Sequence, residues 1–169
     1  LTLIKHVLST IPIHLLSVAV MPKAVFRIIE RACANFLWGS SEEGFRYHWM
    51  GWSKLCLPLE EGGVGFQRLR DVYTAFSYKL WWQFRTGSSL WATFMHAKYC
   101  RGIHPCQAER KPFASKTWRR MQDVSSQDEH SRTWMAKDGV RHFWYDNGSG
   151  SGAVVFESPG VVNVSFRDF

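Results

Sequence analysis

An apolar side chain recurs every four residues between Val72 and Phe84, with Phe76 and Leu80 in between. Side chains at this spacing lie along one face of an α-helix. Asp71 is a suitable N-cap before the pattern, and a glycine at position 87 ends it. The sequence therefore predicts a long amphipathic helix whose apolar face needs a partner.

The next segment, "LWATFMHAKYC", offers that partner. Leu90, Trp91, Phe94, Met95 and Tyr99 fall on one side of a helix. A serine at position 88 or 89 precedes the helix as a cap, and a glycine at position 102 follows it. Because the connection between the two segments is short, we expect an antiparallel helix pair.

Two earlier segments show the same periodicity. Residues 4–15 read as a helix that is interrupted near Pro12, and residues 25–36 as a second helix. On the face opposite its apolar side, the second helix carries Lys23, Arg27 and Arg31, one helical turn apart. We expect two packed amphipathic helices, one of which bears a basic stripe.

The C-terminal part gives weaker signals. Residues 117–124 predict a short helix and residues 125–131 a linker. A Lys-Asp-Gly turn at 137–139 between aromatic flanks predicts a β-hairpin, and the Gly/Ser-rich tail is expected to pack poorly. The predicted fold class is mainly α, with a short C-terminal β-hairpin, and the expected segments are 1–39 (helices), 40–70 (connector with a Gly-rich turn), 71–124 (basic helical region) and 125–169 (hairpin and tail).

The aromatic content indicates a packed core. Nine tryptophans and twelve phenylalanines accompany a hydrophobic fraction of 46%, and rings of this size are either buried or offered to a partner. We therefore do not expect disorder throughout the chain. Trp81, Trp82 and Trp91 fit a helical core, although stacking on nucleic-acid bases is an alternative.

The positive charge is concentrated in one region. Residues 85–120 hold eight basic residues against the single acid Glu109, whereas the rest of the chain holds thirteen of each sign. The formal net charge of +7 therefore resides in that region. A polyanion is the natural partner of such a segment, and a solvated basic surface without a partner is the alternative.

The adjacent acids Glu60 and Glu61 precede three glycines in "EEGGVG". A phosphate-binding loop would need a lysine and a hydroxyl residue after the last glycine, and neither is present. Neighbouring side chains in a turning backbone tend to point apart, so a catalytic carboxylate pair is not expected. The motif predicts a turn that leads into Phe66.

Four potential metal ligands lie close together in the sequence: His96, Cys100, His104 and Cys106. Their spacing matches no zinc knuckle, so we expect no metal site. No Gly-x-Ser-x-Gly nucleophile motif is present, and no cofactor or small-molecule substrate is expected. The cysteines show no disulfide pattern, which favours an intracellular protein, nuclear or cytoplasmic. The apolar start is too interrupted to span a bilayer, so no membrane partner is expected.

Six ordered blocks resemble the polyprotein of plant non-LTR (LINE-type) retrotransposons. They are "LTLIKHVLSTIPIHLLSV", "IERACANFLWG", "HWMGWSKLCLPLEEGGVGF", "DVYTAFSYKLWWQFR", "SLWATFMHAKYC" and "FWYDN". The resemblance covers nearly the whole chain and is to the reverse-transcriptase thumb and the region after it. It implies a thumb-like helical bundle in a fragment whose palm and fingers are missing.

The resemblance also implies a role. A thumb grips template and primer through backbone phosphates, so an RNA–DNA hybrid or duplex, bound without sequence preference, is the expected partner. The residues that fit this task are Lys23, Arg27, Arg31, Lys98, Arg101, Lys116, Arg119 and Arg120. Polymerisation in this family needs an Asp-Asp pair for two magnesium ions, and the sequence contains none. We therefore expect no catalysis by this chain alone, and a protein-interaction module without nucleic-acid binding is the alternative.

Overall fold

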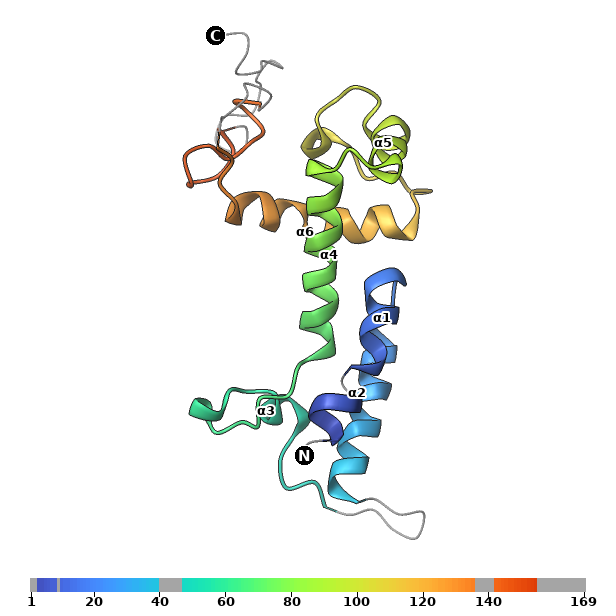
Figure 1. Cartoon of the computed structure of the whole chain (residues 1–169), viewed down its shortest axis with the longest axis vertical. Helices are drawn as coiled ribbons and strands as arrows, with labels where there is room; N and C mark the ends of the chain where they lie inside the picture. Colours follow the sequence, from blue (N-terminus) through green and yellow to red (C-terminus); the bar gives the residue numbers. More distant parts are fainter. Residues whose placement is uncertain (1–2, 9, 40–46, 136–141, 155–169) are drawn as a thin grey trace. The chain divides into compact units, whose positions relative to one another are not determined.

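The computed structural model describes residues 3–8, 10–39, 47–135 and 142–154. This described part is built of helices and turns and contains no strand, which confirms a mainly α fold (Figure 1). None of its helices is long and apolar enough to cross a membrane. The elements in chain order are η1 (Ile4–Leu8), α1 (Ile11–Val18), α2 (Lys23–Trp38), α3 (Trp52–Leu55), η2 (Leu59–Glu61), α4 (Leu69–Thr86), α5 (Leu90–Met95), η3 (His96–Cys100), η4 (Pro105–Gln107) and α6 (Lys116–Ser131).

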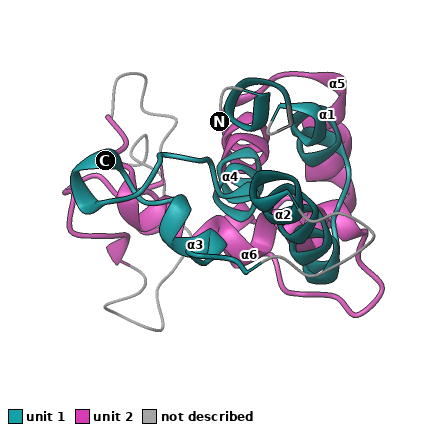
Figure 2. Ribbon diagram, turned by 90° about the horizontal axis from the view of Figure 1, so that it is seen from below, with its two compact units in different colours: residues 1–77 teal, residues 78–169 magenta. Residues whose placement is uncertain are grey.

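The chain forms two compact units, residues 1–77 and 78–169, which are coloured separately in Figure 2. The boundary falls within α4, so the first half of that helix belongs to unit 1 and the second half to unit 2. The four segments expected from the sequence remain a prediction. Each unit is described by itself below.

Unit 1 contains α1, α2, α3 and the start of α4. Pro12 lies in the first turn of α1, where its missing N–H costs no helical hydrogen bond, so the helix begins there instead of bending around it. Leu16, Phe26 and Leu69 form one buried cluster of this unit. A second cluster joins Ile4 to Leu55 and Phe66, and the ring of Trp52 stacks on Phe66 at 5.3 Å.

The Gly-rich motif of unit 1 is a turn, and its two acids are exposed. Gly62 ends η2 in the left-handed conformation, with φ of 78°. The Gly63 amide donates to the Pro58 carbonyl at 2.9 Å, and a Cβ at Gly63 would lie 2.0 Å from the carbonyl oxygen of Leu57. Only glycine allows this close approach of two backbone segments.

Unit 2 is organised around aromatic contacts between helices. Trp81 and Phe84 from the second half of α4 pack against Trp118 from α6, and all three side chains are at most 1% exposed. The ring of Tyr99 in η3 stacks on Trp118 at 4.4 Å, and His96 stacks on Phe84 at 4.2 Å. The expected pairing of α4 with the segment 90–99 is thus seen in the core contacts of this unit.

Two helix boundaries differ clearly from the sequence prediction. The first is the end of α6, because this helix continues to Ser131 through the expected linker 125–131. Asp128 and Glu129 lie on its buried face, where ion pairs with Arg132 and Arg85 compensate their charge. A pattern of apolar residues cannot reveal such a face, because the residues that continue it are acids.

The second boundary is the start of α4. This helix begins at Leu69, so Asp71 lies within its first turn and is not the N-cap. A carboxylate in the first turn still interacts favourably with the positive end of the helix dipole. The sequence therefore indicated correctly that the helix begins near Asp71, but it did not indicate which residue is the N-cap.

The predicted C-terminal β-hairpin is not supported. Its turn, 137–139, lies outside the described residues, and the described flanks, 132–135 and 142–147, form no strand. The Trp134 amide donates to the Asn147 carbonyl at 2.7 Å, while Asp146 turns back to the His142 carbonyl at 3.0 Å. These flanks are irregular segments held by individual hydrogen bonds.

Candidate nucleic-acid interface

Three cations of unit 2 surround a concavity of about 370 Å³, which we call the cationic hollow. None of the described residues that line it is acidic. Its lining comes from the end of η3 and from the loop before α6, and consists of Lys98, Tyr99, Arg101, Lys111, Pro112, Phe113 and Ala114. An acid-free group of cations around a concave surface attracts an anion.

The first wall of the cationic hollow depends on an unusual helix end. After α5 the chain continues as the π-helical turn η3, and it ends at Arg101 with φ of 49°. Among the described residues Arg101 is the one non-glycine residue with a positive φ. Left-handed conformations at such residues and π-helical turns are both enriched at functional sites. Here they place Lys98 and Arg101 on one wall.

The second wall is the loop 111–115, which is tied to η3 and α6. The Ser115 amide donates to the Tyr99 hydroxyl at 3.1 Å, and Arg119 Nε donates to the Ala114 carbonyl at 3.2 Å. Ser115 also caps α6, because its Oγ accepts from the Trp118 amide at 3.2 Å. The loop that carries Lys111 and Phe113 is therefore fixed at its C-terminal end.

Lys98 lies above two aromatic rings, at 5.4 Å from the centroids of both Phe94 and Tyr99. These contacts orient its ammonium without neutralising it, as an ion pair would. Burial alone would raise the pKa of Tyr99, but the hydrogen bond from Ser115 and the charge of Lys98 lower it. Tyr99, which lines the cationic hollow, is thus held by Ser115 and lies beside the charge of Lys98.

The predicted binding residues of α6 separate into two groups. Lys116 and Arg119 are exposed and flank the loop of the cationic hollow. Arg120 is 3% exposed, so its guanidinium is enclosed by the protein and does not face solvent. The prediction that Arg120 belongs to the binding surface is therefore corrected. Neighbouring residues on an α-helix point about 100° apart, so Arg119 is on the exposed face while Arg120 points into the core.

The stripe on α2, formed by Lys23, Arg27 and Arg31, is exposed in unit 1 as its spacing predicts. Lys23 and Arg27 line a smaller concavity of about 130 Å³ together with Phe26, Glu30 and Arg70. Burial raises the pKa of Glu30, although Arg68 and Arg70 oppose the shift. An acid within the lining makes this surface less suited to a phosphate than the cationic hollow.

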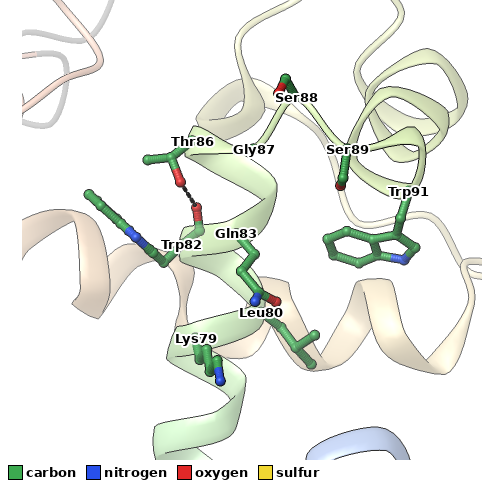
Figure 3. Close-up of a pocket in the computed structure, with 9 residues that line it drawn as sticks. All are labelled: Lys79, Leu80, Trp82, Gln83, Thr86, Gly87, Ser88, Ser89 and Trp91. Carbon is green, nitrogen blue, oxygen red and sulfur yellow. Dashed lines mark hydrogen bonds between the residues drawn. The ribbon is translucent and has the colours of Figure 1, made fainter.

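A broader groove, of about 870 Å³, runs along the end of α4 and the start of α5 (Figure 3). Trp82 and Trp91 both border it. The ring of Trp82 already stacks on Trp134 at 5.2 Å and lies 4.4 Å from the Arg132 guanidinium, so a nucleic-acid base would have to displace these contacts. Trp81 is buried in the core.

A buried polar network holds the C-terminal segment of unit 2 to its helices. Arg85 of α4 donates to Glu129 of α6 at 2.7 Å and forms a second ion pair with Asp146. The Trp81 and Trp134 indoles donate to the two oxygens of Glu129, at 2.8 and 3.0 Å. Burial opposes the charge on Arg85, but its two carboxylate partners raise its pKa. Arg85 therefore stays charged in the network.

His104 and Asn147 complete this network. His104 Nδ1 accepts from the Cys106 amide at 3.3 Å, and its Nε2 lies 3.2 Å from Arg85 Nη1 and 3.4 Å from Asp146. Burial lowers the pKa of His104. Asn147 is wholly buried: its Nδ2 donates to the His130 carbonyl at 3.1 Å, and its Oδ1 accepts from the amides of residues 150 and 152.

The four sequence candidates for metal ligands have other partners or lie in the core. His96 Nε2 lies 3.1 Å from the Phe84 carbonyl, and Cys100 is 2% exposed. Burial raises the pKa of Cys100 to about 11 and raises that of Cys106 further. In the described ranges, no three His, Cys, Asp or Glu residues are grouped so as to hold a metal ion.

Two residues of the cationic hollow were not predicted from the sequence. Lys111 is one of several cations in 85–120, and no periodicity marks it as part of a site. Phe113 lies in a loop between Pro112 and Ala114, and its side chain is 100% exposed. A bulky ring beside a proline and two basic residues in "RKPF" is the one signal that could have indicated it.

Comparison with known proteins finds a relative that bears on function. An Arabidopsis thaliana protein with the name "Putative ribonuclease H protein At1g65750" is 33% identical over 159 residues, which covers 86% of this chain. The chain spans 24% of that relative's length. No protein-family model matches the chain, and no solved structure matches it.

This relative overturns the resemblance drawn from the six sequence blocks. Its name is that of a ribonuclease H protein, so the assignment to a reverse-transcriptase thumb is wrong, and the expected missing palm and fingers have no support.

Proposed function

We propose that this chain is a nucleic-acid-binding segment of a ribonuclease H-type protein, and that it binds the sugar-phosphate backbone without sequence preference. The observation that carries the proposal is the cationic hollow, which three cations line and whose described lining holds no acid. The name of the relative supports a nucleic-acid partner, and an RNA–DNA hybrid is the substrate that defines ribonuclease H. Contacts to phosphates position a protein on such a partner but do not read its sequence.

We also propose that the described part holds nucleic acid and does not cleave it. The buried carboxylates of unit 2 are engaged by structural partners: Glu129 and Asp146 by Arg85, and Asp128 by Arg132. Asp123, which is exposed, pairs with Arg110. Carboxylates held in this way serve the fold, so we assign no cleavage chemistry to them.

The test measures binding of a fluorescent RNA–DNA hybrid by anisotropy across a salt series. The triple variant Lys98→Glu, Arg101→Glu, Lys111→Glu should lose at least about tenfold in affinity at low salt. The slope of log K against log salt should also fall by about 2 to 3, because each lost phosphate contact removes about 0.9. Circular dichroism checks that the variant is folded.

The stripe on α2 provides a matched control. The triple variant Lys23→Glu, Arg27→Glu, Arg31→Glu changes the net charge by the same amount and should lose less affinity. Equal losses in the two variants would mean that the overall charge, not the cationic hollow, governs binding. Salt-insensitive binding, or none, would favour the protein-interaction module instead.

A further inference from the structure

Phe113 is the most exposed large apolar side chain of the described residues, and it lines the cationic hollow. A single exposed phenylalanine on a protein surface needs no explanation. Phe113, however, lines the same concavity as Tyr99 and three cations. It therefore adds a flat apolar face to the proposed phosphate-binding surface. A nucleotide combines the same two chemistries.

The ring is presented by a loop with little freedom. The Ala114 amide closes a turn onto the Lys111 carbonyl at 3.1 Å, and Ala114 itself is buried. Pro112 fixes its own φ, and the Ser115 amide binds the Tyr99 hydroxyl. Because the backbone on both sides of Phe113 is already ordered, a ligand that stacks on the ring pays little further entropy to order it.

The cations line the same concavity as the exposed ring. Lys98 and Arg101 come from one wall of the cationic hollow, and Lys111 comes from the wall that also carries Phe113. In a duplex both faces of every internal base are covered by its neighbours, whereas an unpaired base has a face to offer. Stacking on an aromatic side chain works for every base, so it is consistent with binding without sequence preference.

We propose that the cationic hollow takes an unpaired nucleotide, whose base stacks on Phe113 while Lys98, Arg101 and Lys111 bind the phosphates on either side. This inference rests on the proposed function and specifies its substrate: a single-stranded segment of DNA or RNA. The chain then prefers a single strand, or an overhang beside a hybrid, to a blunt hybrid of the same length.

The experiment compares labelled single strands of deoxythymidine and of uridine with a blunt hybrid of equal length. Phe113→Ala should weaken single-strand binding by about 5- to 150-fold, the range of aromatic stacking on one base, and change hybrid binding by less than about twofold. Phe113→Trp should retain single-strand binding. Trp49→Ala removes another exposed ring, 80% exposed in unit 1, and should have no effect.

A spectroscopic readout separates stacking from a structural role. A 2-aminopurine placed in the single strand should change its fluorescence on binding to the unchanged protein and to Phe113→Trp, but not to Phe113→Ala. Loss of single-strand binding on one polymer only would limit the site to DNA or to RNA. Equal losses on single strand and hybrid, or no loss, would overturn the inference. If Phe113→Ala has no effect while the triple charge reversal of the cationic hollow weakens binding, the inference fails and the proposed function stands.

Discussion

Arg85 Nε donates to Glu129 Oε1 at 2.7 Å, and the two side chains are only 6% and 1% exposed. A charge pair so far from water stabilises a fold only while both partners are present, since either one alone is an uncompensated buried charge. The pair joins α4 to α6 and, through Asp146, to the segment 142–147. This network therefore attaches the segment 142–147 to α4 and α6.

Loss of one partner should be costly. We expect Arg85→Met to lower the free energy of unfolding by about 3 to 5 kcal/mol, and Glu129→Gln to lower it by a smaller amount because the amide keeps part of the hydrogen bonding. The control is Arg110→Met, which breaks the pair with Asp123, where both side chains are more than 60% exposed. That change should cost less than about 1 kcal/mol. Urea unfolding monitored by circular dichroism measures both, and similar losses would contradict the assignment.

Acid should destabilise unit 2 through Asp146. Burial opposes ionisation of this carboxyl, but its hydrogen bond with His104 and the charge of Arg85 lower its pKa to about 2, from an ordinary value of 3.8. A depressed pKa gives stability that is complete above pH 4 and is lost as the pH falls toward 2. The loss should reach about 2 kcal/mol. In Asp146→Asn the unfolding free energy should lack this part of the pH dependence.

His104 should contribute at a higher pH. Burial lowers its pKa, so the folded protein keeps it neutral where the unfolded chain already takes up a proton. The unfolded state then binds more protons, and stability should fall as the pH drops below 6.5. Urea midpoints at pH 7.5 and 5.5 measure this slope. His104→Gln should flatten it and the exposed His14→Gln should not; equal slopes in all three proteins would rule out the contribution.

Gly63 should not tolerate a side chain. A Cβ there would lie 2.0 Å from the Leu57 carbonyl oxygen, which belongs to the backbone and cannot move aside cheaply. We expect Gly63→Ala to cost about 3 kcal/mol. Gly148→Ala is the control, because no atom lies within 4 Å of its added Cβ and its φ is not positive. Thermal unfolding of both variants tests the difference, and a Gly63→Ala protein as stable as the control would show that the turn can open.

The thiols should react slowly in the folded protein. Burial raises the pKa of Cys33 and Cys56 and brings that of Cys100 to about 11, so the nucleophilic thiolate is scarce near neutral pH. A disulfide-exchange reagent that releases a coloured thiolate should titrate these cysteines slowly at pH 7.5 and quickly in concentrated urea. A fast phase without urea would reveal a thiol that is accessible in the fold.

The helices could be predicted from the sequence because their apolar side chains recur with a helical period. Val72, Phe76, Leu80 and Phe84 mark α4 whatever lies around them. The end of α6 could not be predicted in this way, since Glu129 is buried by partners that are distant in sequence. Its burial depends on tertiary contacts that no local pattern contains.

The candidate site shows the same division. The concentration of cations in 85–120 indicated the right region, but not which of them face solvent. Arg119 is exposed and its neighbour Arg120 is buried, just as Trp82 is partly exposed and Trp81 is not. Phe113 gave no periodic signal, because a loop residue is positioned by the hydrogen bonds of its neighbours.

The burial of Asn147 also affects how the protein ages chemically. An asparagine followed by glycine, here Gly148, is the pair most prone to deamidation, in which the next backbone nitrogen attacks the side-chain amide to form a succinimide. Hydrogen bonds to the His130 carbonyl and from the amides of residues 150 and 152 hold that amide in place. We therefore expect the native fold to slow deamidation of Asn147, and unfolding of the segment to remove this protection.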